Sequence, residues 1–74
     1  MSIKLSTVIE KDINGYYAYC PELKGCQTQG DTLDEAYENL KEAIDLYLET
    51  LSEDELNDIS SQEILTGSYE AKVG

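Results

Sequence analysis

The sequence predicts an α+β domain in which one long amphipathic helix packs on a small antiparallel or mixed β-sheet, in the order β-β-β-α-β. Three observations support this prediction. Apolar and polar residues alternate near both ends of the 74-residue chain, as they do in strands. An Asn-Gly turn signal separates the first two alternating runs. Apolar residues with helical spacing fill the middle of the chain. This length is that of a single domain, spanning residues 1–74.

The first two strands are expected to form a hairpin. Residues 2–10 are rich in β-branched side chains and place apolar groups and Thr on one face, which favours a strand. These are Ile3, Leu5, Thr7 and Ile9. Asn14-Gly15 tolerates positive φ at low cost and predicts the turn. The returning strand, 16–20, carries Tyr17 and Tyr19 on one face, with Tyr16, Ala18 and Cys20 on the other.

A short loop and a third strand follow the hairpin. Pro21 has no N–H to donate, so it ends the second strand or marks a sheet edge. Residues 26–29 predict a brief third strand, which Gly30 is expected to break.

The helix begins with a capping signal. The Thr32 hydroxyl is expected to accept from the Glu35 N–H, while the Glu35 carboxylate reaches back to the Thr32 N–H. Apolar residues then recur every three or four positions as far as Leu51, and predict a core-facing stripe of about five turns. On this face Tyr37 and Tyr47 are expected to be buried. The opposite face carries Glu38, Glu42, Asp45 and Glu49.

The last third of the chain is less regular. Residues 52–61 read as an acidic connection with at most a short helical turn. Residues 64–73 alternate again around Gly67 and predict a final strand.

The net charge of −11 is unevenly distributed. Twelve of the sixteen acidic residues, and only one of the five lysines, lie between residues 31 and 63. This segment therefore carries all the net charge and favours a basic partner, whereas direct binding of nucleic acid is not expected.

Two cysteines and the absence of histidine limit the chemistry of the chain. Cys20 and Cys26 are expected to be plain buried thiols rather than half of a zinc site, with a disulfide forming only under oxidant. A catalytic triad has no base without histidine. No cofactor and no metal are expected, and the chain is not expected to be an enzyme.

The stretch from Gly15 to Glu49 resembles the N-terminal domain of HicB-like antitoxins. The residues that carry this resemblance are Gly15-Tyr16-Tyr17, Cys20-Pro21-Glu22-Leu23, Gly25-Cys26, the run from Gly30 to Ala36, and the helix from Asn39 to Leu48. The resemblance implies a partial ribonuclease-H-like fold without nuclease activity. It also implies a basic partner, a HicA-type toxin that cuts mRNA with a histidine and whose active site the antitoxin covers. Many family members carry a C-terminal DNA-binding domain, for which a chain ending at Gly74 is expected to have no room.

Two groups of residues are candidates for the partner interface. On the second strand, Tyr17 and Tyr19 suit either an interface or the core, since the chain has no Phe or Trp to fill a core. On the helix, Glu38, Glu42, Asp45 and Glu49, together with the acids at 53–55, serve either to steer a basic toxin or only to keep the chain soluble.

The sequence is compatible with two further functions. One is an orphan, homo-oligomeric binding module without a toxin. A metal-dependent nuclease using Glu10, Asp12 and Glu70 is the weaker alternative. The positions of these acids in the predicted strands and turn are those of ordinary turn and surface residues. A homodimer or higher homo-oligomer is expected, since so small a core needs a supplement. Neither a signal peptide nor a membrane span is indicated, so a cytoplasmic location is expected.

Overall fold

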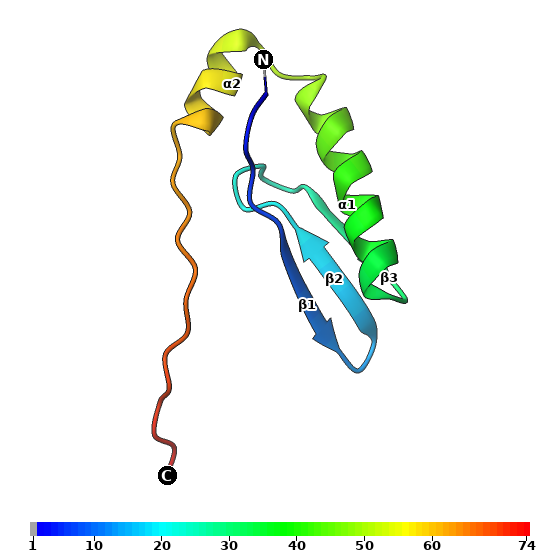
Figure 1. The fold of residues 1–74 in the computed structure, drawn as a ribbon, viewed down its shortest axis with the longest axis vertical. Coiled ribbons are helices and arrows are strands. Elements are labelled where there is room, and N and C mark those ends of the chain that lie inside the picture. Colours follow the sequence, from blue (N-terminus) through cyan, green and yellow to red (C-terminus); the bar gives the residue numbers. More distant parts are fainter. Residues whose placement is uncertain (1) are drawn as a thin grey trace.

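The computed structural model describes residues 2–74 and shows a three-stranded antiparallel sheet and two helices (Figure 1). The strands are β1 (Val8–Asp12), β2 (Gly15–Tyr19) and β3 (Gln27–Gly30), in the spatial order β1-β2-β3. The helices are α1 (Leu33–Leu48) and α2 (Glu53–Ser60). The predicted α+β class, with one long helix on a small sheet, is confirmed.

The β1–β2 hairpin turns where the sequence predicts. Asp12 pairs with Gly15, and the Asp12 side chain accepts a 2.8 Å hydrogen bond from the Asn14 N–H. The positive φ of 127° falls on Gly15, so glycine, and not Asn14, takes the strained conformation.

β1 is shorter than predicted and begins at Val8 rather than near residue 2. Val8 pairs with Tyr19, the last residue of β2, and the Cys20 N–H that follows donates to Cys26 instead. Residues 2–7 therefore have no strand beside them. The Glu22 carboxylate holds this segment instead, since it accepts from the Ser6 N–H at 3.0 Å and from the Ser6 hydroxyl at 3.0 Å.

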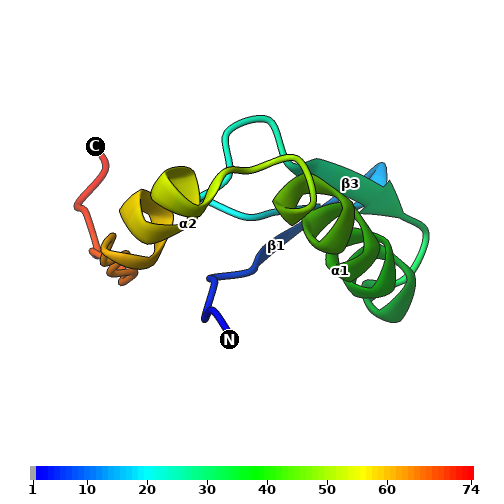
Figure 2. The same cartoon turned by 90° about the horizontal axis from the view of Figure 1, so that it is seen from above.

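α1 lies across one face of the sheet and makes a two-layer arrangement (Figure 2). Thr32 caps the helix as predicted, with its hydroxyl accepting from the Glu35 N–H at 3.1 Å. The Glu35 carboxylate accepts from the Asp31 N–H at 3.4 Å rather than from Thr32, so only half of the predicted capping box forms. α1 ends at Leu48, about a turn earlier than the apolar stripe suggests.

The core lies between α1 and the sheet. Its buried residues are Ala18, Cys20, Leu23, Cys26, Ala36, Leu40 and Ile44. Tyr47 is half-buried at the edge of this core and donates a 3.2 Å hydrogen bond to the Lys24 carbonyl. Tyr37, predicted to be buried, is 38% exposed, and the Lys41 ammonium lies 4.8 Å from the centroid of its ring.

Two elements of the last third differ from the prediction. Residues 53–60 form an eight-residue helix, α2, where the sequence was interpreted as an acidic connection with at most a short helical turn. The predicted strand over 64–73 does not form, so the observed order is β-β-β-α-α. A strand needs a neighbouring strand to satisfy its backbone groups, and within residues 2–74 none lies against this C-terminal segment.

Candidate partner-binding site

The face of the sheet opposite α1 presents an aromatic pair. Ala18 and Cys20 point into the core, so alternation along β2 turns Tyr17 and Tyr19 to the other face, as predicted. The two rings lie 5.6 Å apart, inclined by 38°. The Tyr17 hydroxyl donates a 2.7 Å hydrogen bond to the Gln27 side chain across the sheet.

Cross-strand neighbours complete this open sheet face. The register places Val8 and Gln27 opposite Tyr19, and Glu10 and Gln29 opposite Tyr17. Both tyrosines are half-buried, and the neighbours at the rim are mostly polar. An aromatic centre inside a polar rim is a composition typical of protein–protein interfaces.

The outward side of α1 presents an acidic stripe, defined here as Glu38, Glu42, Asp45 and Glu49. The four residues follow one another at steps of four, three and four, which keeps them on one side of the helix, and all are exposed. Lys41 forms an ion pair with Glu38 at 2.8 Å, the one ion pair found in residues 2–74. This contact raises the pKa of Lys41 and partly compensates one end of the stripe.

α2 extends the acidic surface beyond the end of α1. The Ser52 hydroxyl accepts from the Glu55 N–H, and the Glu55 carboxylate accepts from the Ser52 N–H at 3.0 Å. These bonds lower the pKa of Glu55. Glu53 and Asp54 share this first turn and face solvent. The Ser52-x-x-Glu55 spacing is the sequence signal that identifies this helix, and the sequence interpretation missed it.

The structure separates the two groups of candidate residues. The tyrosine pair lies on the open face of the sheet, whereas the acidic stripe lies on the far side of the helix that covers the other face. The thickness of the molecule stands between them. They therefore form two separate surfaces rather than one, which the sequence pattern does not reveal.

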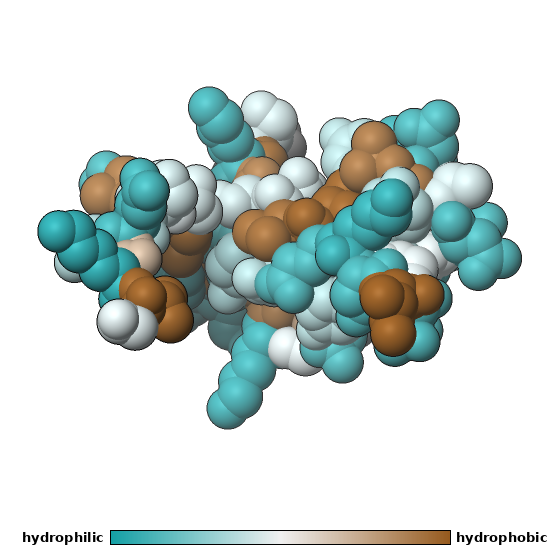
Figure 3. Space-filling view, turned by 90° about the horizontal axis from the view of Figure 1, so that it is seen from below, coloured by the Kyte–Doolittle hydropathy of each residue, from teal (hydrophilic) through white to brown (hydrophobic). Residues whose placement is uncertain are grey.

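The apolar surface is divided in a similar way. In the space-filling view, apolar side chains form separate patches between polar ones (Figure 3). The large exposed apolar residues come from the hairpin tip, from α1 and from the C-terminal segment: Ile13, Leu33, Tyr37, Leu46, Leu65, Tyr69 and Val73.

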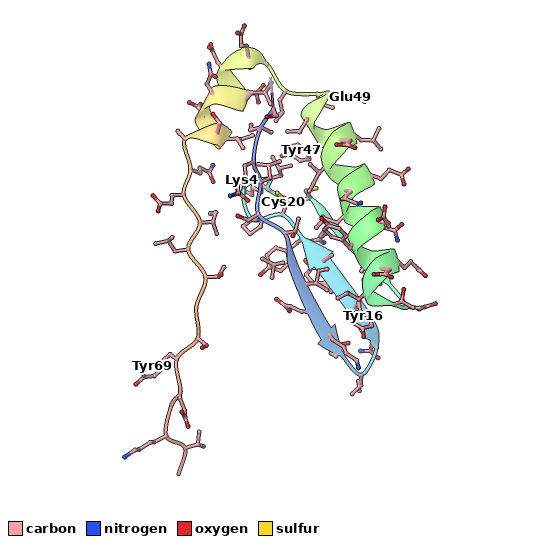
Figure 4. All side chains as sticks on the ribbon, viewed as in Figure 1. Lys4, Tyr16, Cys20, Tyr47, Glu49 and Tyr69 are labelled. Carbon is pink, nitrogen blue, oxygen red and sulfur yellow. The ribbon has the colours of Figure 1, made fainter. Side chains whose placement is uncertain are left out.

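The cysteines are buried free thiols, as predicted (Figure 4 labels Cys20). Burial, with a smaller contribution from the nearby Glu22 carboxylate, raises the pKa of Cys20 to about 11. Burial also raises the pKa of Cys26. Both thiols are thus protonated at neutral pH, and neither is an activated nucleophile.

The acids of the weaker alternative do not converge. Glu10 and Asp12 lie on β1 and line a polar depression of about 510 Å³ beside the hairpin, whereas Glu70 lies in the exposed C-terminal segment. Within residues 2–74, no group of three or more His, Cys, Asp or Glu side chains is arranged to hold a metal ion. In the same range no helix has the length and apolar character needed to cross a membrane.

Relatives of the chain occur in bacteria, in archaea and in a bacteriophage. A UPF0150 protein of Helicobacter pylori (strain J99) is 53% identical over 58 residues, which are 78% of this chain and 81% of the relative. A UPF0150 protein of Archaeoglobus fulgidus is 56% identical over 48 residues, 64% of this chain and 70% of the relative. A third, from Synechocystis, is 53% identical over 47 residues, 62% of this chain and 60% of the relative. No solved structure is significantly similar.

One protein family matches most of the chain. It is described as the HicB_like antitoxin of bacterial toxin-antitoxin system, and the match covers residues 5–71. That range includes the hairpin, both helices and most of the C-terminal segment. The chain therefore belongs to the HicB-like antitoxin family.

Proposed function

We propose that this chain binds a basic, HicA-type mRNA-cleaving toxin and inhibits it by covering the toxin's active site. The observation that carries the proposal is the exposed acidic stripe on α1, in a chain whose net charge of −11 lies entirely within residues 31–63. Membership of an antitoxin family supplies the class of partner.

The stripe has no role in folding that accounts for it. Like charges at positions i and i+3 or i+4 of a helix destabilise that helix by about 0.2–0.5 kcal/mol per pair. Glu42, Asp45 and Glu49 form two such pairs, and no cation lies within ion-pair distance of them in the described chain. The positive charges of a basic partner would offset this repulsion. The free energy that the repulsion costs the free protein would then favour the complex.

The same stripe suits a surface that otherwise binds RNA. Its carboxylates recur about once per helical turn of 5.4 Å, along a straight helix face. A toxin that holds the phosphate groups of RNA presents lysine or arginine side chains, and these pair with carboxylates equally well. An acidic helix lying on that surface would exclude the substrate directly, while the long-range field accelerates the encounter.

Tyr17 and Tyr19 face the opposite side of the molecule, so one toxin bound at the stripe leaves them available to a further protein chain. We include self-association in the proposal, as a homodimer or higher homo-oligomer. Direct binding to nucleic acid is not part of it, because the field of the helices repels phosphate. The proposed site of action is the cytoplasm, where mRNA is found.

The test is an RNA-cleavage assay with a HicA-type toxin from the genome that encodes this chain. We expect cleavage to stop when the chain reaches a near-equal concentration, and we expect a complex on gel filtration at moderate salt. The matched control is a stripe variant, E42K/D45K/E49K, at the same concentrations. Unchanged cleavage with no complex would contradict the proposal and favour the orphan binding module.

A further inference from the structure

The C-terminal segment, residues 64–73, has the side-chain pattern of a half-buried strand and nothing that covers it. Its odd-numbered apolar residues are almost fully exposed: Leu65 by 83%, Tyr69 by 90% and Val73 by 96%. Its even-numbered neighbours from Thr66 to Lys72 are polar or charged. Tyr69 stands on a stretch of chain that runs free of the body (Figure 4). One face of this segment is therefore built to be buried.

The sheet has an open edge that suits such a segment. β1 pairs with β2 on one side only, and no strand within residues 2–74 lies on its outer side. α1 contacts β3 most and β1 least, so this edge is also poorly covered by the helix layer. An uncovered edge presents unpaired backbone N–H and C=O groups that accept an added strand.

The segment does not reach this edge within its own chain. It runs alongside β1 in the same direction without meeting it (Figure 1). Where it leaves α2, a hollow of about 450 Å³ separates Gln62, Glu63 and Ile64 from the N-terminal stretch Lys4–Ser6. Within residues 2–74 of one chain, therefore, neither the outer edge of β1 nor the C-terminal segment pairs with a neighbouring strand.

The size of the uncovered surface is that of a dimer interface. The accessible surface is 6070 Å² for a mass of 8.3 kDa, whereas a globular monomer of that mass exposes about 4,600 Å². The Cα radius of gyration is 14.5 Å, against roughly 11 Å for a compact chain of this length. The excess of about 1,500 Å² per chain lies in the range that one subunit of an obligate homodimer buries.

Charge decides which surfaces of two copies can meet. Helical residues 31–63 carry the whole net charge of −11, so two copies repel each other there. Residues 1–30 contain three lysines and three acids, and residues 64–74 contain Glu70 and Lys72. Both of these parts are neutral, and β1 and the C-terminal segment belong to them. Contact through these two parts brings no unbalanced charge into the interface.

We infer that residues 64–73 of one copy pair with the outer edge of β1 in a second copy, as a fourth strand, and that the second copy returns the same contact. The exchange is a closed, two-fold symmetric arrangement. It covers Leu65, Tyr69 and Val73 and satisfies the backbone groups of both edges. The inference rests on the self-association included in the proposed function, but it does not depend on toxin binding.

The first experiment mixes equal amounts of ¹⁵N-labelled and ¹³C-labelled full-length chain and records isotope-filtered NOE spectra, with the mass measured by analytical ultracentrifugation. We expect a dimer with intermolecular NOEs between residues 8–12 and residues 64–73. A monomer whose NOEs between these residues are only intramolecular overturns the inference. A dimer in which residues 64–73 lack NOEs to any β1 also overturns it.

The second experiment compares two variants with the same added charge in the same segment. L65K/Y69K places lysines on the face to be buried, and T66K/S68K places them on the polar face. We expect L65K/Y69K to raise the dimer Kd at least about a hundredfold, and T66K/S68K to change it less than about fivefold. Unchanged far-UV circular dichroism in both variants shows that the body still folds. Equal effects of the two variants would contradict the exchange.

Toxin assays separate this inference from the proposed function. A monomeric L65K/Y69K chain that still inhibits RNA cleavage leaves the exchange intact and shows that inhibition does not need it. A wild-type chain that dimerises as described but inhibits no toxin removes the antitoxin proposal alone.

Discussion

A single residue, Gly30, sets how closely α1 approaches the sheet. It is the last residue of β3 and pairs with Tyr16, rather than breaking the strand ahead of its end as the sequence suggests. A Cβ at this position would lie 2.6 Å from the Ala36 N atom and 3.0 Å from the Ala36 Cα. Because both atoms belong to the helix backbone, no side-chain rotation can make room.

Gly30→Ala is expected to destabilise the fold by about 1–3 kcal/mol, since the first turn of α1 must move away from β3. The matched control is Gly67→Ala, where a Cβ meets nothing within 4 Å. Urea denaturation followed by circular dichroism measures both. If the two variants unfold at the same midpoint, the close approach of helix and strand does not limit the stability of the domain.

At the scale of the element, the ends of the helices are fixed by hydrogen bonds that are readable in the sequence. Thr32 and Ser52 each accept a hydrogen bond from the N–H three residues later. The acids in both first turns, such as Asp34 and Glu53, also complement the positive end of the helix dipole. α2 depends on its cap more than α1 does, because it is eight residues long and has no fully buried residue.

Ser52→Ala is expected to cost α2 about 1 kcal/mol and to increase amide exchange over residues 53–60, with little change in α1. Ser60→Ala is the control within the same helix, since its hydroxyl donates to the Asn57 carbonyl and caps no N–H. Equal exchange in the two variants would show that the Ser52 cap does not hold the helix.

The cap of α2 should also be lost in acid. Hydrogen bonds from Ser52 lower the folded-state pKa of Glu55, so the folded helix favours the ionised form. The stability that this group contributes is therefore present above the ordinary carboxyl pKa, and it disappears as the pH falls through the lowered folded value. Residues 53–60 should show this loss before the β1–β2 hairpin does, as NMR chemical shifts recorded from pH 6 to pH 2 can establish. Simultaneous loss of both would mean that α2 and the hairpin unfold together.

At the scale of the whole molecule, charge is divided between two halves. The helical half repels itself and attracts cations, whereas the strands and the C-terminal segment are neutral. Under the proposed function and the inferred strand exchange, this division would let one chain present an acidic surface to a basic toxin and a neutral edge to its own copy. The negative charges of the acidic stripe would then strengthen toxin binding, whereas their mutual repulsion lowers the stability of the free chain.

E42Q/D45N/E49Q is expected to stabilise the free chain while it weakens toxin binding. Removing the like-charge pairs of α1 should add up to about 1 kcal/mol, or roughly 5 °C in Tm for a domain of this size. Association with the toxin should slow at least about tenfold at low salt. Calorimetry and stopped-flow binding measure the two effects.

The matched control is E53Q/D54N/D58N, which changes the net charge equally but removes Glu53 and Asp54, two of the acids that favour the start of α2. It should lower Tm and slow association less than the stripe variant does. A stripe variant with lower stability, or with unchanged association, would contradict the assignment of the stripe to toxin binding.

The sequence by itself determined the features that depend on local spacing. These include the turn at Asn14-Gly15, the Thr32 cap, the buried face of α1 through Ala36, Leu40 and Ile44, and the shared face of Tyr17 and Tyr19. Each of these features depends on residues only a few positions apart in the chain. The turn and the cap depend on local backbone conformation, and the buried faces depend on side chains that recur every two residues in a strand or every 3.6 in a helix. The order of turn, loop and cap residues also pointed to the family that matches residues 5–71.

Only the tertiary structure decided the features that need a distant partner. Residues 2–7 and 64–73 have strand-like alternation, yet they form no strand because no strand in the described part of the chain, residues 2–74, pairs with them. The sequence pattern predicts that Gly30 breaks the strand. In the structure its role is to let the helix approach, because a Cβ at this position would lie 2.6 Å from the Ala36 N atom. The separation of the tyrosine pair from the acidic stripe likewise follows from the stacking of helix on sheet. Periodicity tells which side of an element a residue occupies, but packing alone tells what lies on that side.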